Sequence, residues 1–422
     1  MAKGDVLIVG KGAREHAFAW KLRLSKHVKR IYAAPGNPGT AIIGENIPIN
    51  TEDIYRLAHF ALEKDVELTI IGPEFLLKLG IVDLFHNYNL NIFGPTAAAA
   101  MIETSKLFAK EIMIAAGIPT ASFHAYTSYE EANAYIHERE LPFVIKADGL
   151  AGGKGAYICR NLDEGREALT DLMIKRIHSD AGNIVIIEDF LQGEEISIHA
   201  LCNEFSIVPL IEARDAKTLK DGNKGSNTGG MGAYSPVPCF THSDMFHVEQ
   251  TIIQPLLDAL RGRGTVFIGC LYPGLMLTPN GPSVVEFNAR FGDPETQVLM
   301  ALMKNDFFLL LKACINKEPI VPEFSQNKHA VCIVLCSKEY PSSINNPVPI
   351  YGVDAAARLS DDVIIFHGAT KLVNGQLYTD GGRVLSITAV AESREQARHL
   401  AYSICNQIHF KGKQFRRDIA KA

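Results

Sequence analysis

The 422-residue sequence has no uncharged apolar run approaching the roughly 18 residues that a membrane-spanning helix needs. Its first residues enter an apolar stretch without the hydrophobic region of a signal peptide. An excess of basic charge is also missing, because the formal net charge is −5. We therefore expect a cytoplasmic protein with neither a membrane partner nor a nucleic-acid partner.

Paired cysteine spacing is absent as well. Of the eight cysteines only Cys332 and Cys336 lie near each other, and most of the eight stand in apolar runs. The C-x-x-C frame of a zinc site is not formed. The pattern predicts buried, reduced thiols.

The length predicts two to four domains. The first part alternates apolar runs with amphipathic segments, which indicates a parallel sheet with helices on its faces. A small α/β unit follows at about residues 122–190. From Phe324 onward strands dominate, and we expect this last part to cover the functional site rather than to supply its chemistry. Within it, Gly381-Gly382-Arg383 is expected to form a turn rather than to bind a ligand. The expected strands of the first part are 6–9, 30–34 and 68–71. The expected helices of the whole chain include 53–64, 77–87, 103–116, 163–177 and 393–408.

A glycine-rich loop, Lys146–Gly155, directly follows the apolar run 143–145. Its four glycines let the backbone approach an anion closely, and its lysines add positive charge, so it suits a polyphosphate. The loop is not a Walker A motif, because Gly155 follows Lys154 where a hydroxyl residue is required. Since it joins two strands of a small layer, it could close over a ligand as a lid. A flexible surface turn is the alternative interpretation.

The first glycine turn contains Gly10 and Gly12 and opens a helix. A dinucleotide fold is disfavoured because Glu15 replaces the third glycine and no acidic residue stands about 20 positions later. One phosphate group still suits a helix start below such a turn, so a sugar phosphate fits better, with Gly72-Pro73-Glu74 at the same sheet edge. Tight turns that need glycine only for steric reasons remain the alternative.

Two further stretches carry polar groups. Glu188–Leu191 ends an apolar strand and could offer a purine an apolar slot and backbone hydrogen bonds, while Glu195 could accept from ribose hydroxyls. Solvated acids at a strand end are the alternative.

Residues 214–232 form a long polar loop whose Asn227–Gly232 end suits a carboxylate or sugar hydroxyl. A merely flexible loop is the alternative there.

The metal site is the clearest prediction from the residues. Glu286 and Asn288 lie two positions apart on an expected strand, so their side chains project from the same face. A carboxylate and an amide oxygen suit magnesium, which completes its shell with phosphates and water. Arg290 follows within reach of the same phosphates, and Pro294 begins a helix. A polar edge strand is the alternative.

Taken together, Lys106, the glycine-rich loop, Glu188–Leu191, Glu195 and the Glu286-x-Asn288 pair resemble the ATP-grasp fold. Five more motifs, in order, resemble the phosphoribosylamine-glycine ligases, also called glycinamide ribonucleotide synthetases, and the similarity runs from about residue 5 to 420. These motifs are 12–16, 34–37, 72–74, 227–234 and 288–297. The sequence differs from the family pattern at Lys11, Ala13, Gly153, Ala216 and Ser226.

The resemblance implies an α/β and α+β multidomain protein. Its parts would be an N-terminal parallel-sheet (pre-ATP-grasp) domain at 1–103, a two-part ATP-grasp domain at 104–324 with a mobile lid at about 122–190, and a small C-terminal α+β domain at 325–422. The expected state is a monomer, with a dimer as the alternative.

The implied activity is ATP-dependent joining of glycine to 5-phosphoribosylamine through glycyl phosphate, in de novo purine biosynthesis, with Mg²⁺ or Mn²⁺. The alternatives are another ATP-grasp carboxylate-amine or carboxylating ligase of purine synthesis and a non-catalytic nucleotide-binding module. Asp215 or Asp293 would hold the glycine ammonium. The alternative is that one of them takes the proton of the amine.

The resemblance also implies a set of site residues. The catalytic residues would be Lys146, Lys154, Arg290, Asp215 and Asp293. The nucleotide-binding residues would be Lys106, Lys146, Gly152, Gly153, Lys154, Gly155, Glu188, Asp189, Phe190, Leu191 and Glu195. The substrate-binding residues would be Gly12, Arg14, Glu15, Asn37, Gly72, Pro73, Glu74, Asp215, Lys217, Asn227, Thr228, Gly229, Gly230, Met231, Arg290, Gly292 and Asp293, and the metal ligands Glu286 and Asn288.

Overall fold

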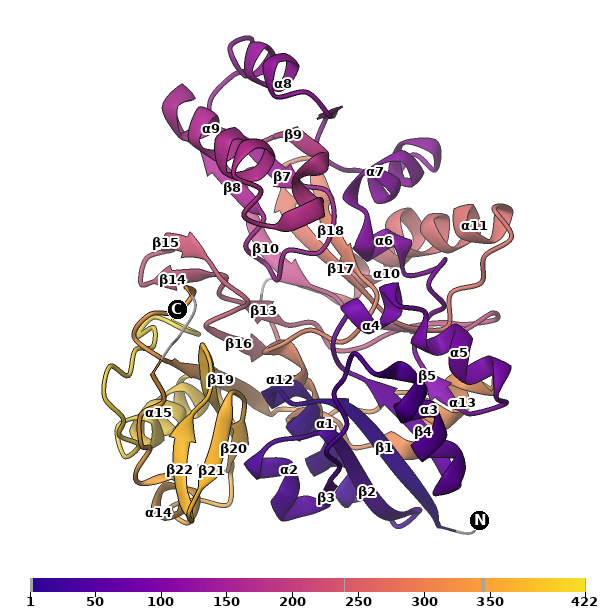
Figure 1. Ribbon diagram of the computed structural model, residues 1–422, viewed down its shortest axis with the longest axis vertical. Helices are drawn as coiled ribbons and strands as arrows, with labels where there is room; N and C mark the ends of the chain where they lie inside the picture. The colour runs from indigo at the N-terminus through magenta and orange to yellow at the C-terminus, as the bar shows by residue number, and fades with distance from the viewer. Residues whose placement is uncertain (1–2, 239, 343–345, 422) are drawn as a thin grey trace.

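The structure, a computed structural model, describes residues 3–238, 240–342 and 346–421. Figure 1 shows an N-terminal part, a lid that projects from the body, a central part and a C-terminal part. The N-terminal part is the predicted parallel sheet, with strand order β3-β2-β1-β4-β5. Its strands are β1 Gly4–Gly10, β2 Val28–Pro35, β3 Glu45–Asn46, β4 Val66–Ile71 and β5 Ile92–Phe93. Its helices are α1 Ala13–Arg23, α2 Pro38–Ile43, α3 Ile54–Glu63, α4 Phe75–Lys78 and α5 Ile81–Asn87.

Two helices that the periodicity predicts as continuous are interrupted. Residues 77–87 do not form one helix, because Gly80 adopts a left-handed conformation (φ +76°) between α4 and α5. The predicted helix at 103–116 is also divided, into α6 (Met101–Thr104) and α7 (Lys106–Ala115). At this break Ser105 is extended, and its hydroxyl accepts the Phe108 N–H to cap α7.

The lid is an antiparallel sheet of order β6-β9-β7-β8, with helices packed on one face. Its apolar core includes Phe143, Ile145, Leu169 and Val185. The predicted helix at 163–177 is shorter, because α9 ends at Leu169 and a π-helical turn and a 3-10 turn follow. The lid elements are β6 Phe123–Tyr126, α8 Tyr129–Ile136, β7 Phe143–Ala147, β8 Ala156–Cys159, α9 Leu162–Leu169, the π-helical turn Thr170–Ile174, the 3-10 turn Ser179–Asn183 and β9 Val185–Asp189.

The central part is built on the hairpin β17–β18, whose first strand also pairs with β10 and β11. Helices α10 and α11, joined by a π-helical turn, lie against this sheet beside α7 (Figure 1). The elements are β10 Glu194–Ser197, β11 Ala200–Cys202, β12 Ile207–Pro209, α10 His242–Val248, the π-helical turn Glu249–Ile253, α11 Gln254–Gly262, β17 Gly269–Thr278, β18 Gly281–Asn288, α12 Glu295–Leu302 and α13 Phe307–Ile315.

The C-terminal sheet, of order β13-β16-β19-β23-β20, includes strands from before residue 325. The predicted long loop at 214–232 is largely extended: β13 and β16 join this sheet, and β14–β15 form a separate hairpin. Gly222 and Gly225 have positive φ values around its turn. The elements are β13 Arg214–Asp215, β14 Thr218–Lys220, β15 Lys224–Asn227, β16 Gly232–Ser235, β19 His329–Cys336, α14 Val353–Ala357, β20 Val363–His367, β21 Thr370–Val373, β22 Gln376–Thr379, β23 Arg383–Ala391 and α15 Arg394–Cys405.

The cysteine prediction is confirmed where the structure describes the residues. Seven cysteines are buried and unpaired, and Cys239 lies outside the described residues. Among residues 3–238, 240–342 and 346–421, no helix is long and apolar enough to cross a bilayer.

His16 joins the N-terminal and C-terminal parts. Its Nδ1 accepts the His367 N–H (2.8 Å), and its ring packs edge-on against Phe366. Burial, together with the neighbouring His367, lowers the pKa of His16 to about 3. The imidazole is therefore held in its neutral form.

We expect this burial to make the protein less stable in acid. The lowered folded-state pKa gives a contribution to stability that is present above pH 6.5 and falls by about 1.4 kcal/mol per pH unit as the pH drops from 6.5 toward about 3. In His16→Asn the amide oxygen can accept the same hydrogen bond without titrating, so denaturant unfolding should show a flatter pH dependence. His59→Asn, an exposed change on α3, should keep the wild-type slope. Equal slopes for the wild type and His16→Asn would contradict the assignment.

Candidate active site

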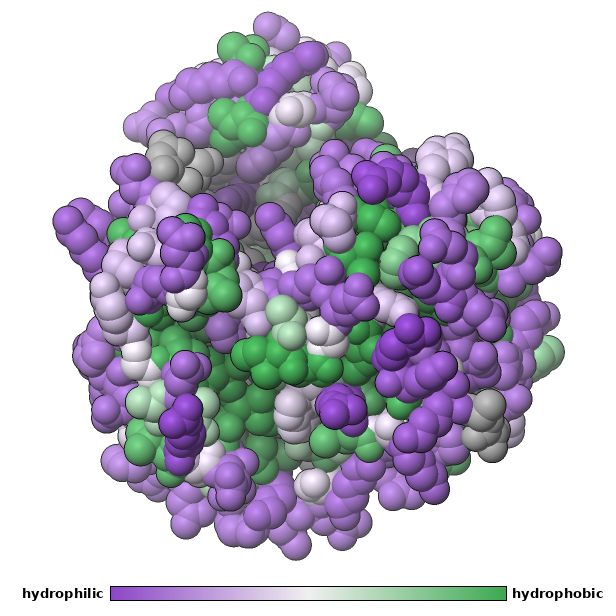
Figure 2. Space-filling model, turned by 60° about the horizontal axis from the view of Figure 1, so that its bottom comes forward, coloured by the Kyte–Doolittle hydropathy of each residue, from purple (hydrophilic) through white to green (hydrophobic). Residues whose placement is uncertain are grey.

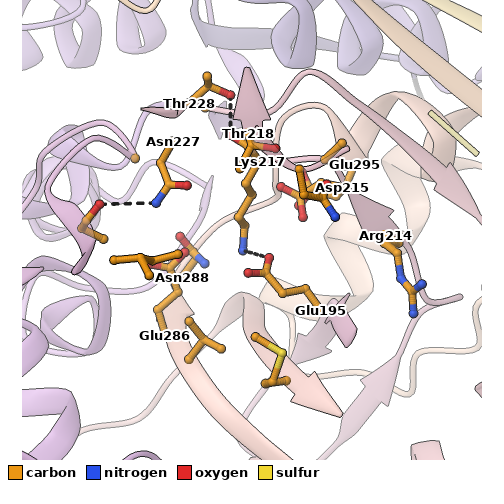
Figure 3. A pocket seen from close by; sticks show the side chains of 18 of the residues that line it. Glu195, Arg214, Asp215, Lys217, Thr218, Asn227, Thr228, Glu286, Asn288 and Glu295 are labelled. Carbon is orange, nitrogen blue, oxygen red and sulfur yellow. Dashed lines mark hydrogen bonds and ion pairs between the residues drawn. The ribbon is translucent and has the colours of Figure 1, made fainter. Parts of the chain in front are cut away.

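A cavity of about 890 Å³ lies where the lid, the central hairpin and the C-terminal part meet. Figure 2 shows the molecule hollowed below the lid, which is at the top of the view. Most of the predicted site residues line this cavity, and Figure 3 shows 18 of the side chains around it, ten of them labelled. Nine of the predicted residues do not line it: Gly12, Glu15, Asn37, Gly72, Pro73, Lys154, Gly230, Met231 and Gly292.

Two buried lysines and a buried glutamate connect the lid to the central part. Lys146 on β7 forms an ion pair with Glu188 of β9 (2.8 Å) and donates to the Val285 carbonyl of β18 (3.0 Å). Lys110 of α7 approaches the other oxygen of Glu188 (3.2 Å). The Glu188 carboxylate therefore orients Lys146, and the alternative of a solvated acid is wrong for this residue, which is 3% exposed.

The glycine-rich loop is anchored at one end and open at the other. The Asp148 carboxylate accepts from the Leu107 N–H and the Ser105 hydroxyl, and Lys106 donates to the Gly149 carbonyl (2.8 Å). Gly152 and Gly153 have φ of +58° and +75°, which a side chain would strain. The loop can therefore present backbone N–H groups to a ligand in the cavity.

Lys154 points elsewhere in this structure. Its ammonium donates to the Pro341 carbonyl in the C-terminal part and lies 6.0 Å from the centre of the Tyr340 ring. A contact between Lys154 and a phosphate would require this lysine to leave Pro341, so its catalytic role remains a prediction.

Beyond Glu188 the strand end is arranged as a nucleotide base would need. Phe190 and Leu191 line the cavity together with Val144, Ile158 and Met276, which gives an apolar slot. Asp189 also lines the cavity, and its carboxylate forms an ion pair with Arg139.

Glu286 and Asn288 both line the cavity from β18, as their spacing predicts. Burial alone would raise the pKa of Glu286, but Lys217, Lys106 and Lys146 lower it overall, so the carboxylate is ionised. Asn288 presents its amide oxygen, which accepts from the Arg290 guanidinium (2.9 Å). Although β18 lies at the edge of its sheet, Asn288 is buried and faces the cavity, which disfavours the polar-edge alternative.

An ionised carboxylate and an amide oxygen fit a hard cation that takes its remaining ligands from phosphate and water. No cluster of three or more His, Cys, Asp or Glu side chains that could enclose a metal occurs in the described part of the chain. This composition suits magnesium better than zinc.

Arg290 is held between carboxylates. Its guanidinium approaches Glu103 (3.0 Å) and Glu74 (3.5 Å), and Glu103 also accepts the Ala289 N–H (2.7 Å). Burial raises the pKa of Glu103 to about 7 despite the neighbouring Arg290. This network places Arg290 beside Asn288 at the cavity wall.

A second polar group lies across the cavity. Figure 3 shows Lys217 extending toward Glu195 (3.1 Å), between Asp215 on one side and Glu286 on the other. Burial lowers the pKa of Lys217, but Glu195 and Asp215 raise it overall. Burial also raises the pKa of Asp215 to about 8, against the opposing effect of Lys217. The Lys217 ammonium can receive a carboxylate, and Asp215 can receive an ammonium in its ionised form.

The sequence analysis did not predict two residues of this cavity wall, Tyr272 and Glu295. Tyr272 donates to Glu295 (2.6 Å), and Ser197 hydrogen-bonds to both side chains. Glu295 belongs to the motif 288–297, which could have identified it as a site residue. No sequence motif includes Tyr272.

The polar groups at the glycine turn of the N-terminal part bond mainly to one another. Glu15 accepts the Gly12 N–H (2.5 Å) and pairs with Arg14 (2.7 Å). Asn37 caps α2 and donates to the Lys11, Gly12 and His367 carbonyls. Only Arg14 and Glu74 of the predicted N-terminal residues face the cavity.

Only part of the 227–232 segment lines the cavity. Asn227, Thr228 and Gly229 line the cavity, whereas the Met231 side chain is buried against Val334, Cys336 and Tyr340. Its burial makes Met231 a packing residue in this structure.

The C-terminal part does more than cover the cavity, because its side chains form part of the cavity wall. Arg383, which the sequence indicated only as a turn residue, pairs with Asp293 (2.9 Å) and donates to the Gly229 carbonyl (2.6 Å). The pKa of Asp293 is lowered overall because Arg383 and Arg14 outweigh the effect of burial. Arg383, Arg416 and Asp418 all line the cavity.

Comparison with known proteins gives the family. Three family models match in order: phosphoribosylglycinamide synthetase N domain at residues 4–103, its ATP-grasp (A) domain at 104–296 and its C domain at 330–422. The chain belongs to the phosphoribosylglycinamide synthetase family. The predicted α/β and α+β architecture, with a parallel-sheet domain, an ATP-grasp domain and a C-terminal domain, is thereby confirmed.

Relatives agree over nearly the whole chain. A phosphoribosylamine–glycine ligase of Caldanaerobacter subterraneus is 42% identical over 416 residues, which cover 98% of this chain and 99% of the relative. The crystal structure of phosphoribosylamine–glycine ligase from Thermotoga maritima superposes with a TM-score of 0.83 at 34% identity, over 98% of this chain and all of that one. The biotin carboxylase domain of Hydrogenobacter thermophilus 2-oxoglutarate carboxylase (TM-score 0.73, 16% identity, covering 98% and 92%) shares the fold.

Proposed function

We propose that this phosphoribosylglycinamide synthetase family member joins glycine to 5-phosphoribosylamine, forming glycinamide ribonucleotide, ADP and phosphate. One observation carries the proposal. A single cavity brings together Lys106 and Lys146, the Glu286–Asn288 pair, and the mixed-charge group of Asp215 and Lys217. The two lysines can bind a polyphosphate, and the Glu286–Asn288 pair can bind its cation. The mixed-charge group can bind a small zwitterion.

The first step is attack of the glycine carboxylate on the γ-phosphate of ATP, which breaks the bond to ADP and forms glycyl phosphate. Phosphoryl transfer depends mostly on positioning and charge neutralisation. Lys146, held by Glu188, and Arg290, held by Glu103, are fixed positive charges that need little reorganisation. Phe190 and Leu191 would hold the adenine, and Glu195 the ribose.

The second step is attack of the phosphoribosylamine nitrogen on the acyl carbon, with release of phosphate. Asp215 lies beside Lys217 and is directed toward the same space. It would bind the glycine ammonium, while Asp293, held by Arg383, would bind the sugar amine or its hydroxyls. Arg14 and Glu74 face the cavity from the N-terminal part and would complete the sugar-phosphate site.

A divalent cation fits the donor set of Glu286 and Asn288, and would neutralise the negative charge of the phosphates when bound. The biotin carboxylase domain that shares the fold was crystallised with the magnesium salt of ADP. We propose Mg²⁺ for this chain, with Mn²⁺ as the substitute. The chain's own part is to keep Glu286 ionised and Asn288 oriented.

Exclusion of water is required because glycyl phosphate hydrolyses readily. The lid touches the body at several points, for example where the Asn227 amide donates to the Ala156 carbonyl (3.3 Å). We propose that the lid opens for substrates and closes for the reaction, and that the protein acts as a monomer.

The test is ADP formation with ATP, magnesium and freshly made phosphoribosylamine. We expect release of ADP that depends on glycine and not on bicarbonate, and formation of glycinamide ribonucleotide. ADP release that is indifferent to glycine would contradict the proposal, and release that requires bicarbonate would indicate a carboxylating ligase. Tight ATP binding without phosphate release would indicate a non-catalytic module.

A further inference from the structure

The hairpin β14–β15 has little apolar support. Residues 220–226 are exposed, and within the hairpin only Leu219 packs against a buried cluster, that of Met231 and Tyr340. A two-stranded hairpin is marginally stable by itself in water. Its position must therefore depend on polar contacts with another part of the chain.

Arg416 provides the densest of these contacts. Its guanidinium donates to the Thr218 hydroxyl (2.9 Å) and carbonyl (3.2 Å) on β14, and to the Asn223 side chain (3.0 Å) at the turn. The same group forms two hydrogen bonds to Asp418 (2.7 and 2.8 Å). Arg416 is 4% exposed, so these bonds are shielded from water.

The chain around Arg416 also binds the hairpin. The Asp418 carboxylate accepts the Gly222 N–H (2.7 Å), and the Arg417 N–H donates to Asp221 (2.7 Å). Figure 1 shows this end of the chain beside β14 and β15. Residues 416–419 are in turn fixed to α15, since Tyr402 donates to the Arg416 carbonyl (2.8 Å) and Arg398 to that of Ile419 (3.0 Å).

The two ends of the hairpin enter the cavity. Lys217 precedes β14 and reaches toward Glu195, whereas Asn227 ends β15 and donates to Ala156 next to the glycine-rich loop. Thr228 follows, and its carbonyl lies so close to Gly153 that a Cβ added there would be 3.1 Å away. A displacement of the hairpin would therefore move both a charged group of the site and the surface on which the lid rests.

We propose that Arg416 is a positioning residue, whose planar fork holds the β14–β15 hairpin so that Lys217 and Asn227 face the cavity and the lid. The proposal adds a positioning residue to the proposed ligase function. Only its kinetic test depends on that function. The fork matters because one lysine ammonium could not reach Thr218, Asn223 and Asp418 together.

The test compares Arg416→Ala with Arg417→Ala, whose side chain is exposed and is directed at Phe415. Hydrogen exchange of the full-length proteins without substrates should be faster at residues 218–227 in Arg416→Ala and unchanged in Arg417→Ala. In the ligase assay Arg416→Ala should raise the KM for glycine and for the sugar amine about tenfold with a smaller change in kcat. These exchange data do not depend on which reaction the protein catalyses.

Arg416→Lys separates positioning from a direct effect of charge. If the fork positions the hairpin, Lys should restore neither the slow exchange nor the KM values; full recovery of both would overturn the proposal. Thr218→Val removes the hydroxyl that accepts from Arg416 without changing the turn, so it covers the case in which Arg416→Ala fails to fold, and it should also speed exchange in the hairpin. Exchange at 218–227 that stays at the wild-type rate in the folded variants would overturn the proposal as well.

Discussion

Glu286→Ala is expected to lower kcat by about 100-fold or more while the protein remains folded. Glu286 is the one carboxylate of the predicted metal pair, and it is kept ionised by Lys217, Lys106 and Lys146. Removing it leaves Asn288 as the only proposed oxygen ligand and takes away a negative charge that balances these lysines. Saturation should then need a much higher magnesium concentration, which titration of the rate with Mg²⁺ measures.

The matched control is Glu111→Ala, an exposed glutamate on α7, the helix that begins at Lys106. It should leave kcat, the magnesium requirement and the melting temperature near their wild-type values. Wild-type turnover in Glu286→Ala would mean that the cation is held elsewhere. A large drop in melting temperature would instead indicate that Glu286 mainly balances the charge of the lysines.

Arg290→Met should reduce both stability and activity. The change keeps much of the side-chain volume but leaves the buried Glu103 without the cation that pairs with it, which costs about 3–5 kcal/mol for a buried pair. It also removes the donor that orients the Asn288 oxygen (2.9 Å). Denaturant unfolding measures the first effect, and the steady-state rate, which we expect to fall by about 100-fold or more, measures the second.

A double variant separates these effects. In Arg290→Met with Glu103→Gln the amide oxygen can still accept the Ala289 N–H, so part of the stability should return. Activity should not return, since no positive charge is restored at the phosphates. Recovery of activity in the double variant would show that Arg290 acts only through the fold. Arg358→Met, an exposed change after α14, should alter neither quantity.

Local patterns in the sequence were informative wherever a few neighbouring residues decide the structure. The two-residue spacing of Glu286 and Asn288 gave their common face because a strand has a period of two. The parallel sheet followed from alternating strands and helices, and burial of the thiols followed from the apolar runs around them. Even locally the prediction was incomplete, because Gly80 and Ser105 each interrupt a helix that hydrophobic periodicity predicts as continuous.

Contacts between distant segments were not accessible in this way. Arg383 reaches Asp293, 90 residues earlier, and Arg416 reaches Thr218, 198 residues earlier. Neither arginine belongs to a short motif, and nothing in their neighbours indicates the partner. The same is true of the strands β13 and β16, which join a sheet whose other strands come after residue 325.

By itself, the sequence determined the family, the order of the domains and the chemical kinds of group that the site contains, because each depends on motifs of adjacent residues. Only the tertiary structure decided which side chains face the cavity, that Lys154 contacts Pro341, and that C-terminal arginines line the site. The physical reason is that these outcomes depend on how separately folded layers pack, and a buried charge is placed by partners that the packing brings to it.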